Sequence, residues 1–131
     1  MTLKELSQLF YINKEIEKLQ SEILTLNDRL SKITQSLDAM PKGNGVTDKI
    51  GNITTDLVYQ KEMLSIKQLQ LEAEKTKLTS FINGIDDSFL RLVFRYRFIE
   101  LKTWWQVADA VGGNNTADGC RKAVMRYLKN I

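Results

Sequence analysis

Histidine is absent from the 131-residue sequence, and cysteine occurs once, at Cys120. Nucleophilic systems of the Ser–His and Cys–His kind need a histidine as the base that activates the nucleophile, so the absence of histidine excludes them. A single cysteine cannot form an internal disulfide, and the usual zinc-binding sets of cysteine and histidine cannot be assembled. The composition therefore predicts a protein that is not an enzyme, with no catalytic residues, no metal site and no cofactor.

Long hydrophobic runs are also missing. No stretch reaches the roughly 18 apolar residues of a membrane-spanning helix, and Met1–Glu5 lacks the basic and then apolar order of a signal peptide. We therefore expect a soluble, cytoplasmic protein without a membrane partner. A hydrophobic content of 43% nevertheless excludes a wholly disordered chain, and the length suits one ordinary domain or two small ones.

Apolar residues recur at alternating intervals of three and four through the first part of the chain. This spacing is typical of a coiled-coil seam along one face of a helix. The seam consists of Leu9, Ile12, Ile16, Leu19, Ile23, Leu26, Leu30, Ile33 and Leu37. Neither proline nor glycine interrupts it, so we predict one long helix.

The single proline, Pro41, and the nearby Gly43 and Gly45 end this helix and predict a loop over about 38–47. We interpret the Met40-Pro41-Lys42-Gly43 segment as a plain hairpin connection, with phosphate contact through its lysine and glycines as the alternative.

A second helix is predicted from about Asp48 to Asn83. Its stripe repeats every seven residues at Ile50, Leu57, Leu64, Leu71, Leu78 and Ile85. The stripe is expected to be widened by Ile53, Ile66, Leu69 and Ala73. Polar Gln60, Lys67 and Glu74 interrupt the second seam column, which predicts looser pairing there.

Two amphipathic helices joined by a short loop bury their stripes by folding back on each other. We therefore predict an antiparallel helical hairpin, or coiled-coil arm, over 1–84. Self-association of the same stripes into a homo-oligomer stays open as the alternative.

Charge is distributed unevenly along the chain. The segment 1–90 holds 11 basic and 13 acidic residues, whereas 91–131 holds 8 basic and 3 acidic ones. A basic, compact segment joined to a nearly neutral helical one suits a protein that meets phosphate with one end only.

A new unit is predicted to start at residue 85 and to run to 131. Asn83-Gly84 supplies a helix C-cap, and Asp86-Asp87-Ser88 an N-cap for the next helix. That helix, Phe89–Ile99, is rich in aromatic residues, and its arginines are expected on its open face.

The pattern after this helix indicates a helix-turn-helix. Thr103 and Gln106 form a capping-box signature before a two-turn helix, in which one of Trp104 and Trp105 should be buried and the other partly exposed. Ala108 and Gly112 suit a close helix contact followed by a turn.

A final helix should bury its apolar side and expose a basic one. The buried side consists of Cys120, Val124, Tyr127 and Leu128. The exposed side is expected to include Met125 and Lys129 beside the candidate DNA contacts. The predicted DNA-binding residues are Asn114, Asn115, Thr116, Asp118, Gly119, Arg121, Lys122 and Arg126. Arg121 and Lys122 are favoured for base edges and Arg126 for phosphate, while a merely solvated basic helix is the alternative.

Three segments resemble the phage-encoded transcriptional regulators of the ArpU and RinA type. They are the loop Met40–Lys49, the junction Phe81–Ser88, and Arg95–Ile99 followed by Thr103–Ala108. The resemblance spans most of the chain and implies a C-terminus like sigma-70 region 4. It further implies activation of late phage genes in the cytoplasm of a bacterial host.

We therefore predict an all-α protein, a helical hairpin followed by a three-helix DNA-binding domain, acting as a phage transcriptional regulator on double-stranded DNA. Two alternatives stay open. One is a DNA-packaging recognition protein similar to a terminase small subunit, which would form a ring. The other is a coiled-coil interaction protein that contacts host RNA polymerase and has no DNA affinity of its own.

Overall fold

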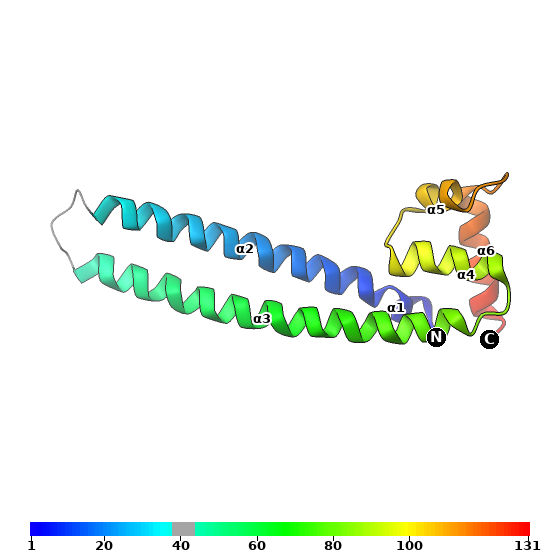
Figure 1. Cartoon of the computed structure of the whole chain (residues 1–131), viewed down its shortest axis with the longest axis horizontal. Coiled ribbons are helices and arrows are strands. Elements are labelled where there is room, and N and C mark those ends of the chain that lie inside the picture. Colours follow the sequence, from blue (N-terminus) through cyan, green and yellow to red (C-terminus); the bar gives the residue numbers. More distant parts are fainter. Residues whose placement is uncertain (38–43) are drawn as a thin grey trace. The chain divides into compact units, whose positions relative to one another are not determined.

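The computed structural model describes residues 1–37 and 44–131, in which helices are joined by short loops and no strand occurs, confirming the all-α class (Figure 1). The elements are α1 (Leu3–Leu6), α2 (Gln8–Leu37), α3 (Asn44–Asn83), α4 (Ser88–Phe94), the π-helix η1 (Arg95–Ile99), α5 (Trp104–Val111) and α6 (Ala117–Lys129). The chain divides into two compact units. Unit 1 comprises Met1–Ile12 and Gln70–Ile131, and unit 2 comprises Asn13–Leu69. The expected boundary between residues 84 and 85 thus lies inside unit 1.

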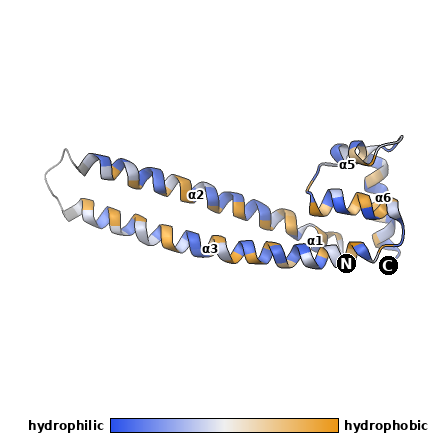
Figure 2. Cartoon of the chain, in the orientation of Figure 1, coloured by the Kyte–Doolittle hydropathy of each residue, from blue (hydrophilic) through white to orange (hydrophobic). Residues whose placement is uncertain are grey.

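Unit 2 is an antiparallel pair formed by most of α2 and the first part of α3. Glu15 of α2 forms an ion pair with Lys67 of α3 at 3.0 Å, and further along, Leu26 and Asp56 line one hollow. Figure 2 shows hydrophobic residues recurring along both helices. The seam predicted for the first helix is confirmed over Leu9–Ile33, because each of its members is buried or half-buried.

The second helix differs from its prediction in two respects. It begins at Asn44 rather than near Asp48, since the first turn of a helix has free N–H groups and tolerates a glycine such as Gly45. The remainder of the predicted loop, including Met40-Pro41-Lys42-Gly43, lies outside the described residues.

The apolar stripe of α3 is also narrower than expected. Ile66, Leu69 and Ala73 are exposed, so the expectation that they widen the stripe is wrong. At about 100° per residue they lie on the side of the helix opposite to Leu57 and Leu64. Ile53 is buried as expected, and the polar Gln60, Lys67 and Glu74 that follow it at intervals of seven are half-buried. The looser pairing predicted there stays a prediction.

The core of unit 1 is built around Phe94, which is fully buried. Its ring lies 6.0 Å from that of Phe81, 5.5 Å from Phe98 and 5.6 Å from Tyr127, measured between centroids. The other buried members come from every helix of the unit: Leu6, Leu9, Leu78, Ile82, Ile85, Val93, Phe98, Val107, Ala108, Cys120 and Val124. Because α3 contributes Leu78 and Ile82, the end of that helix belongs to the same core as α4–α6.

Arginine side chains hold the junction between α3 and α4. Arg91 donates from Nη1 to the carbonyls of Ile85 (2.6 Å) and Asp86 (2.9 Å), and from Nη2 to Ser88 Oγ (2.8 Å). Arg95 donates to Asn83 Oδ1 at 3.2 Å. The expected open arginine face is therefore wrong, because both side chains are half-buried, and Arg91 satisfies backbone acceptors that the loop would otherwise leave open. Asp87 is the N-cap residue but makes no side-chain capping bond.

The second half of the predicted helix 89–99 is a π-helix, which the sequence pattern did not indicate. Glu100 N donates to the carbonyl of Arg95 at 3.0 Å, and Lys102 N donates to that of Tyr96 at 3.0 Å. The widened turn ends at Leu101, which has a φ of 59° although it is not a glycine. Arg97 closes the segment by donating to the carbonyl of Lys102 at 2.8 Å.

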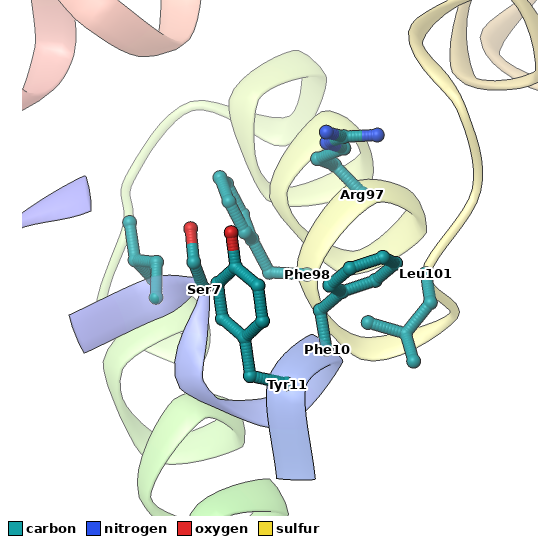
Figure 3. Close-up of a pocket in the computed structure, with 7 residues that line it drawn as sticks. Ser7, Phe10, Tyr11, Arg97, Phe98 and Leu101 are labelled. Atoms are coloured by element: carbon teal, nitrogen blue, oxygen red, sulfur yellow. The ribbon is translucent and has the colours of Figure 1, made fainter. Parts of the chain in front are cut away.

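A hollow of about 120 Å³ lies beside η1 (Figure 3). Its lining includes Ser7, Phe10, Tyr11, Arg97, Phe98 and Leu101. Ser7 Oγ already donates to the carbonyl of Leu3 at 2.8 Å, and Arg97 is bonded as described above. Ligand pockets usually enclose about 300–1,000 Å³. The hollow is therefore too small to favour a cofactor site.

Replacement of Phe94 by alanine tests the core assignment. The change removes a fully buried ring with three aromatic neighbours, so we expect unfolding to become easier by about 3–5 kcal/mol. Leu92→Ala, two positions away and 43% exposed, is the control and should cost less than about 1 kcal/mol. Denaturant titration followed by tryptophan fluorescence reports on unit 1, which contains both tryptophans. Equal losses in the two variants would show that Phe94 is not the centre of this core.

Candidate nucleic-acid interface

Helix α5 starts with the capping box expected from the sequence. Thr103 Oγ1 accepts from Gln106 N at 3.3 Å, and Gln106 Oε1 accepts from Thr103 N at 2.9 Å. Val107 and Ala108 are buried on the inner side of this helix. The prediction of a short, capped helix with a small residue at its contact is confirmed.

The two adjacent tryptophans differ in exposure as predicted, but the inner one is half-buried rather than buried. Trp104 is half-buried, with its ring 6.5 Å from that of Phe98 and the Arg97 guanidinium 4.7 Å above it. Burial lowers the pKa of Arg97 from its ordinary value. Trp105 is 79% exposed, which is unusual for so large an apolar side chain.

The turn between α5 and α6 depends on two glycines. Gly112 has a φ of 77° and Gly113 a φ of 67°, both in the left-handed region that glycine adopts without steric cost. Asn115 Nδ2 donates to the carbonyl of Gly112 at 2.8 Å and holds the turn closed. Sequence analysis placed a glycine in the turn, and the structure confirms it.

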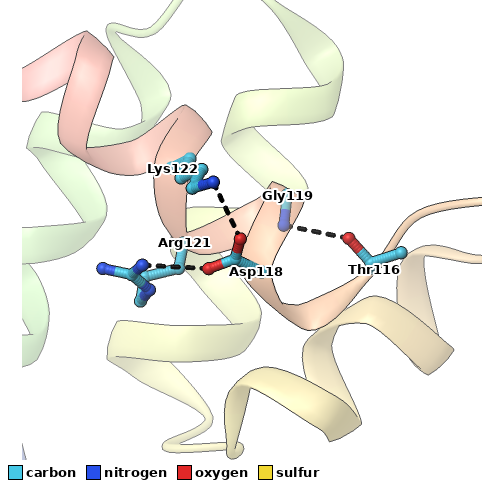
Figure 4. A network of polar contacts seen from close by, with 5 residues as sticks. All are labelled: Thr116, Asp118, Gly119, Arg121 and Lys122. Atoms are coloured by element: carbon cyan, nitrogen blue, oxygen red, sulfur yellow. Dashed lines mark hydrogen bonds and ion pairs between the residues drawn. The ribbon is translucent and has the colours of Figure 1, made fainter.

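Helix α6 is capped by Thr116, whose Oγ1 accepts from Gly119 N at 3.0 Å (Figure 4). A Cβ atom at position 119 would itself stand 3.0 Å from Thr116 Oγ1. Glycine therefore keeps the cap uncrowded.

The apolar side of α6 faces the core as predicted. Cys120 and Val124 are buried, and Tyr127 and Leu128 are half-buried. Burial raises the pKa of the Cys120 thiol, which keeps it protonated at neutral pH. The expected exposed side is found at Asp118, Gly119, Arg121, Lys122, Arg126 and Lys129. Met125 is half-buried rather than exposed, so this part of the expectation is wrong.

The eight candidate DNA-binding residues are all exposed, but some of their side chains are already engaged in hydrogen bonds within the protein. The side chains of Asn115 and Thr116 are engaged by the turn and the cap, whereas Asn114 is exposed beside them. Lys122 lies near the middle of the exposed face. Arg121 and Arg126 are five residues apart, so about 140° separates them around the helix axis and they border opposite edges of this face.

The carboxylate of Asp118 forms ion pairs with two of the other candidates, Arg121 and Lys122. Asp118 Oδ1 pairs with Arg121 Nη2 at 2.9 Å, and Asp118 Oδ2 pairs with Lys122 Nζ at 2.9 Å. Hydrogen bonds from Lys122 and then Arg121 hold the pKa of Asp118 below its ordinary value, so the carboxylate is ionised at neutral pH. Arg126 is apart from this group and lines an open hollow with Asp87 and Phe89.

Asp118 was among the predicted DNA contacts, but its pairing with Arg121 and Lys122 was not predicted. An acidic residue three and four positions before two basic ones is the pattern of helical ion pairs, and it was present in the sequence. The prediction left open which of the two tryptophans faces the core, although the helical register was present in the sequence. Trp104 stands three and four residues before the buried Val107 and Ala108, whereas Trp105 is about 100° away around the helix.

No match to the chain was found among protein-family models, curated proteins or solved structures. Within residues 1–37 and 44–131, no helix combines the length and the apolar character needed to cross a bilayer. In the same part of the chain, no three acidic or cysteine side chains gather closely enough to hold a metal ion.

The reactivity of Cys120 tests which face of α6 points outward. The thiol is buried and protonated, so an aromatic disulfide reagent at neutral pH should modify it only after denaturant is added. In the control, Cys120→Ala combined with Lys122→Cys moves the single thiol to the exposed face, where it should react at once. Similar rates for the two proteins without denaturant would mean that α6 is rotated from the orientation described.

Proposed function

We propose that this protein is a regulator that binds double-stranded DNA through α6, with α5 as the supporting helix of a helix-turn-helix. The observation that carries the proposal is the division of α6 into a buried apolar face and an exposed basic face, directly after a capped short helix and a glycine turn. This order and these faces are what a recognition helix requires.

The charge of the exposed face supports contact with a polyanion. It carries four basic side chains, Arg121, Lys122, Arg126 and Lys129, against the one acidic side chain of Asp118. Cations placed along one helix neutralise phosphates and release counterions, which is the main source of DNA affinity. We therefore expect strong salt dependence of binding.

The positions of the side chains suggest a division of roles. Arg121 and Lys122 lie in the first half of α6, the part that usually enters the major groove, and we assign them to base edges. Arg126 lies one turn or more further along and at the other edge of the face, which suits a phosphate contact. We assign Asn114, which is exposed in the turn, to a backbone or base contact.

We further propose that the protein acts on late phage genes in the cytoplasm of a bacterial host, as an activator that works together with host RNA polymerase. This part rests on the resemblance of Met40–Lys49, Phe81–Ser88, and Arg95–Ile99 with Thr103–Ala108 to phage regulators. The expectations that the protein is not an enzyme and needs no cofactor rest instead on the absence of histidine and the single cysteine.

A DNA-packaging recognition protein is the second candidate, and one observation favours it. Helix α3 exposes Val58 (54%), Tyr59 (59%), Ile66 (49%) and Leu69 (73%), of which Tyr59 also lines the hollow that α3 shares with Leu26 of α2. Such apolar exposure is typical of a surface that associates with another chain. Sedimentation equilibrium separates the candidates, because packaging proteins of this class form rings whereas the regulator needs no more than a dimer.

The functional proposal is tested by changing Arg121, Lys122 and Arg126 to alanine together. All three are exposed, so the fold should persist while binding to a duplex selected from a random pool is lost. The matched control removes three exposed charges from the helical pair through Lys18→Ala, Arg29→Ala and Lys61→Ala, and should bind like the parent. Fluorescence anisotropy at several salt concentrations is the measurement.

The single variants distinguish base contacts from phosphate contacts. Arg121→Ala or Lys122→Ala should cost about 1–3 kcal/mol and relax selectivity at one base position. Arg126→Ala should weaken all sequences alike and reduce the salt slope by about one. If the triple variant keeps the parent's affinity, α6 is not the recognition helix. If the parent itself has no DNA affinity at physiological salt, the protein is an interaction partner rather than a DNA-binding regulator.

A further inference from the structure

The two basic residues nearest the start of α6 are already paired within the helix. Figure 4 shows Arg121 and Lys122 turned toward the carboxylate of Asp118, each pairing with a different oxygen at 2.9 Å. The three side chains remain open to solvent, with exposed fractions of 59% for Asp118, 45% for Arg121 and 64% for Lys122. Carboxylate and phosphate groups both accept hydrogen bonds from cations through anionic oxygens. Asp118 therefore holds Arg121 and Lys122 in the way that a DNA phosphate would.

We propose that Asp118 is a specificity-determining residue that competes with DNA phosphates for Arg121 and Lys122 and so weakens binding to non-cognate duplexes. The inference rests on the proposed function and adds a role for the acidic residue on an otherwise basic face. Backbone phosphates must displace the carboxylate from two cations before those cations contribute to affinity. Asp118 therefore reduces the sequence-independent part of binding.

The position of Asp118 adds a second penalty for incorrect sequences. It stands in the first turn of α6, so its charge is carried into the groove with the base-reading end of the helix. There a carboxylate is repelled by phosphates, and among base edges it finds a partner chiefly in the amino group of cytosine. A matching duplex relieves the penalty by offering such a donor together with acceptors for Arg121 and Lys122. Specific interfaces often use this kind of repulsive element.

The ion pairs have the strength that this role requires. Pairs between exposed side chains are weak and are screened by salt, so a duplex that offers several acceptors can displace them. Because the pKa of Asp118 is lowered by the two cations, its carboxylate stays charged across the neutral range and the competition persists there. A buried pair would instead have locked the cations permanently.

A purely structural role for Asp118 makes different predictions. An acidic side chain in the first turn stabilises a helix through the macrodipole. If that were its whole contribution, removal of the charge would lower the melting temperature and leave DNA selectivity unchanged.

Asp118→Asn separates the two roles, with Asp109→Asn as the matched control. Asp109 is exposed on α5, so its replacement changes the net charge of unit 1 equally without touching Arg121 or Lys122. Each protein is titrated by anisotropy with a random-sequence 24-base-pair duplex and with the duplex that the parent selects from a random pool. Thermal melting is recorded in parallel.

We expect Asp118→Asn to bind the random duplex about three- to tenfold more tightly than the parent and to steepen the salt slope by about one, since an additional phosphate contact becomes available. Affinity for the selected duplex should improve less, so the ratio of specific to random affinity falls. Asp109→Asn should leave that ratio unchanged.

The inference is overturned if Asp118→Asn keeps the parent's affinity ratio, or if it shifts both duplexes by the same factor as Asp109→Asn. Asp118→Ser, which also suits a first turn, provides an independent variant in which the same fall in the ratio is expected. A parent that binds neither duplex, even at low salt, would overturn the proposed function itself and the inference with it.

Discussion

The burial of one face of α6 against the Phe94 cluster is the constraint on which the rest of unit 1 depends. Cys120 and Val124 are fully buried there, and Tyr127 places its ring 5.6 Å from that of Phe94. A helix has only about 100° between successive residues, so burying these positions determines which side chains remain outside. The basic face of α6 is thus a consequence of apolar packing and not of any attraction among its own charges.

The same packing explains how short helices remain folded at the candidate interface. Helix α5 has only eight residues, too few to be stable alone, but its capping box and the buried Val107 and Ala108 hold it in place. Its partner α6 begins after a turn that two glycines with positive φ make possible. A rigid scaffold of this kind lets exposed side chains be presented at fixed positions, which recognition of DNA requires.

Features that follow a simple period or a short motif could be predicted from the sequence. The seam of α2, the Thr103–Gln106 capping box and the buried side of α6 belong to this group, because each depends on neighbours within one or two turns of helix. The π-helix at Arg95–Ile99 and the bonding of Arg91 do not, because they depend on the backbone acceptors that the tertiary fold leaves open.

The error in predicting the stripe of α3 has a different cause. Ile66 and Leu69 were assigned to the stripe because they are apolar, but the angle around the helix, which could be read from the sequence, places them on the exposed side. Half-buried Lys67 is tolerated in the seam because Glu15 of the neighbouring helix lies 3.0 Å away. Of the candidate site, the exposed face could be predicted, whereas the pairing of Asp118 with two cations required knowledge of side-chain positions.

The electrostatic arrangement of α6 suits discrimination as much as affinity. In the proposed complex, the four basic side chains would attract any duplex, and Asp118, in the first turn, would oppose binding that rests on phosphates alone. Specificity depends on the difference between correct and incorrect partners, so a small loss of total affinity can increase it. Under this account, sequence selectivity and salt dependence are linked through the same two ion pairs.

A nuclear magnetic resonance titration of the full, nitrogen-15-labelled chain with a random-sequence 24-base-pair duplex tests the central claim most directly. The account predicts that the largest changes in amide shifts occur in the turn 112–116 and along the exposed face of α6, around Gly119 and Lys122, while residues 13–69 are unaffected. Changes concentrated in 13–69, with α6 unchanged, would contradict it and assign nucleic-acid binding to the helical pair.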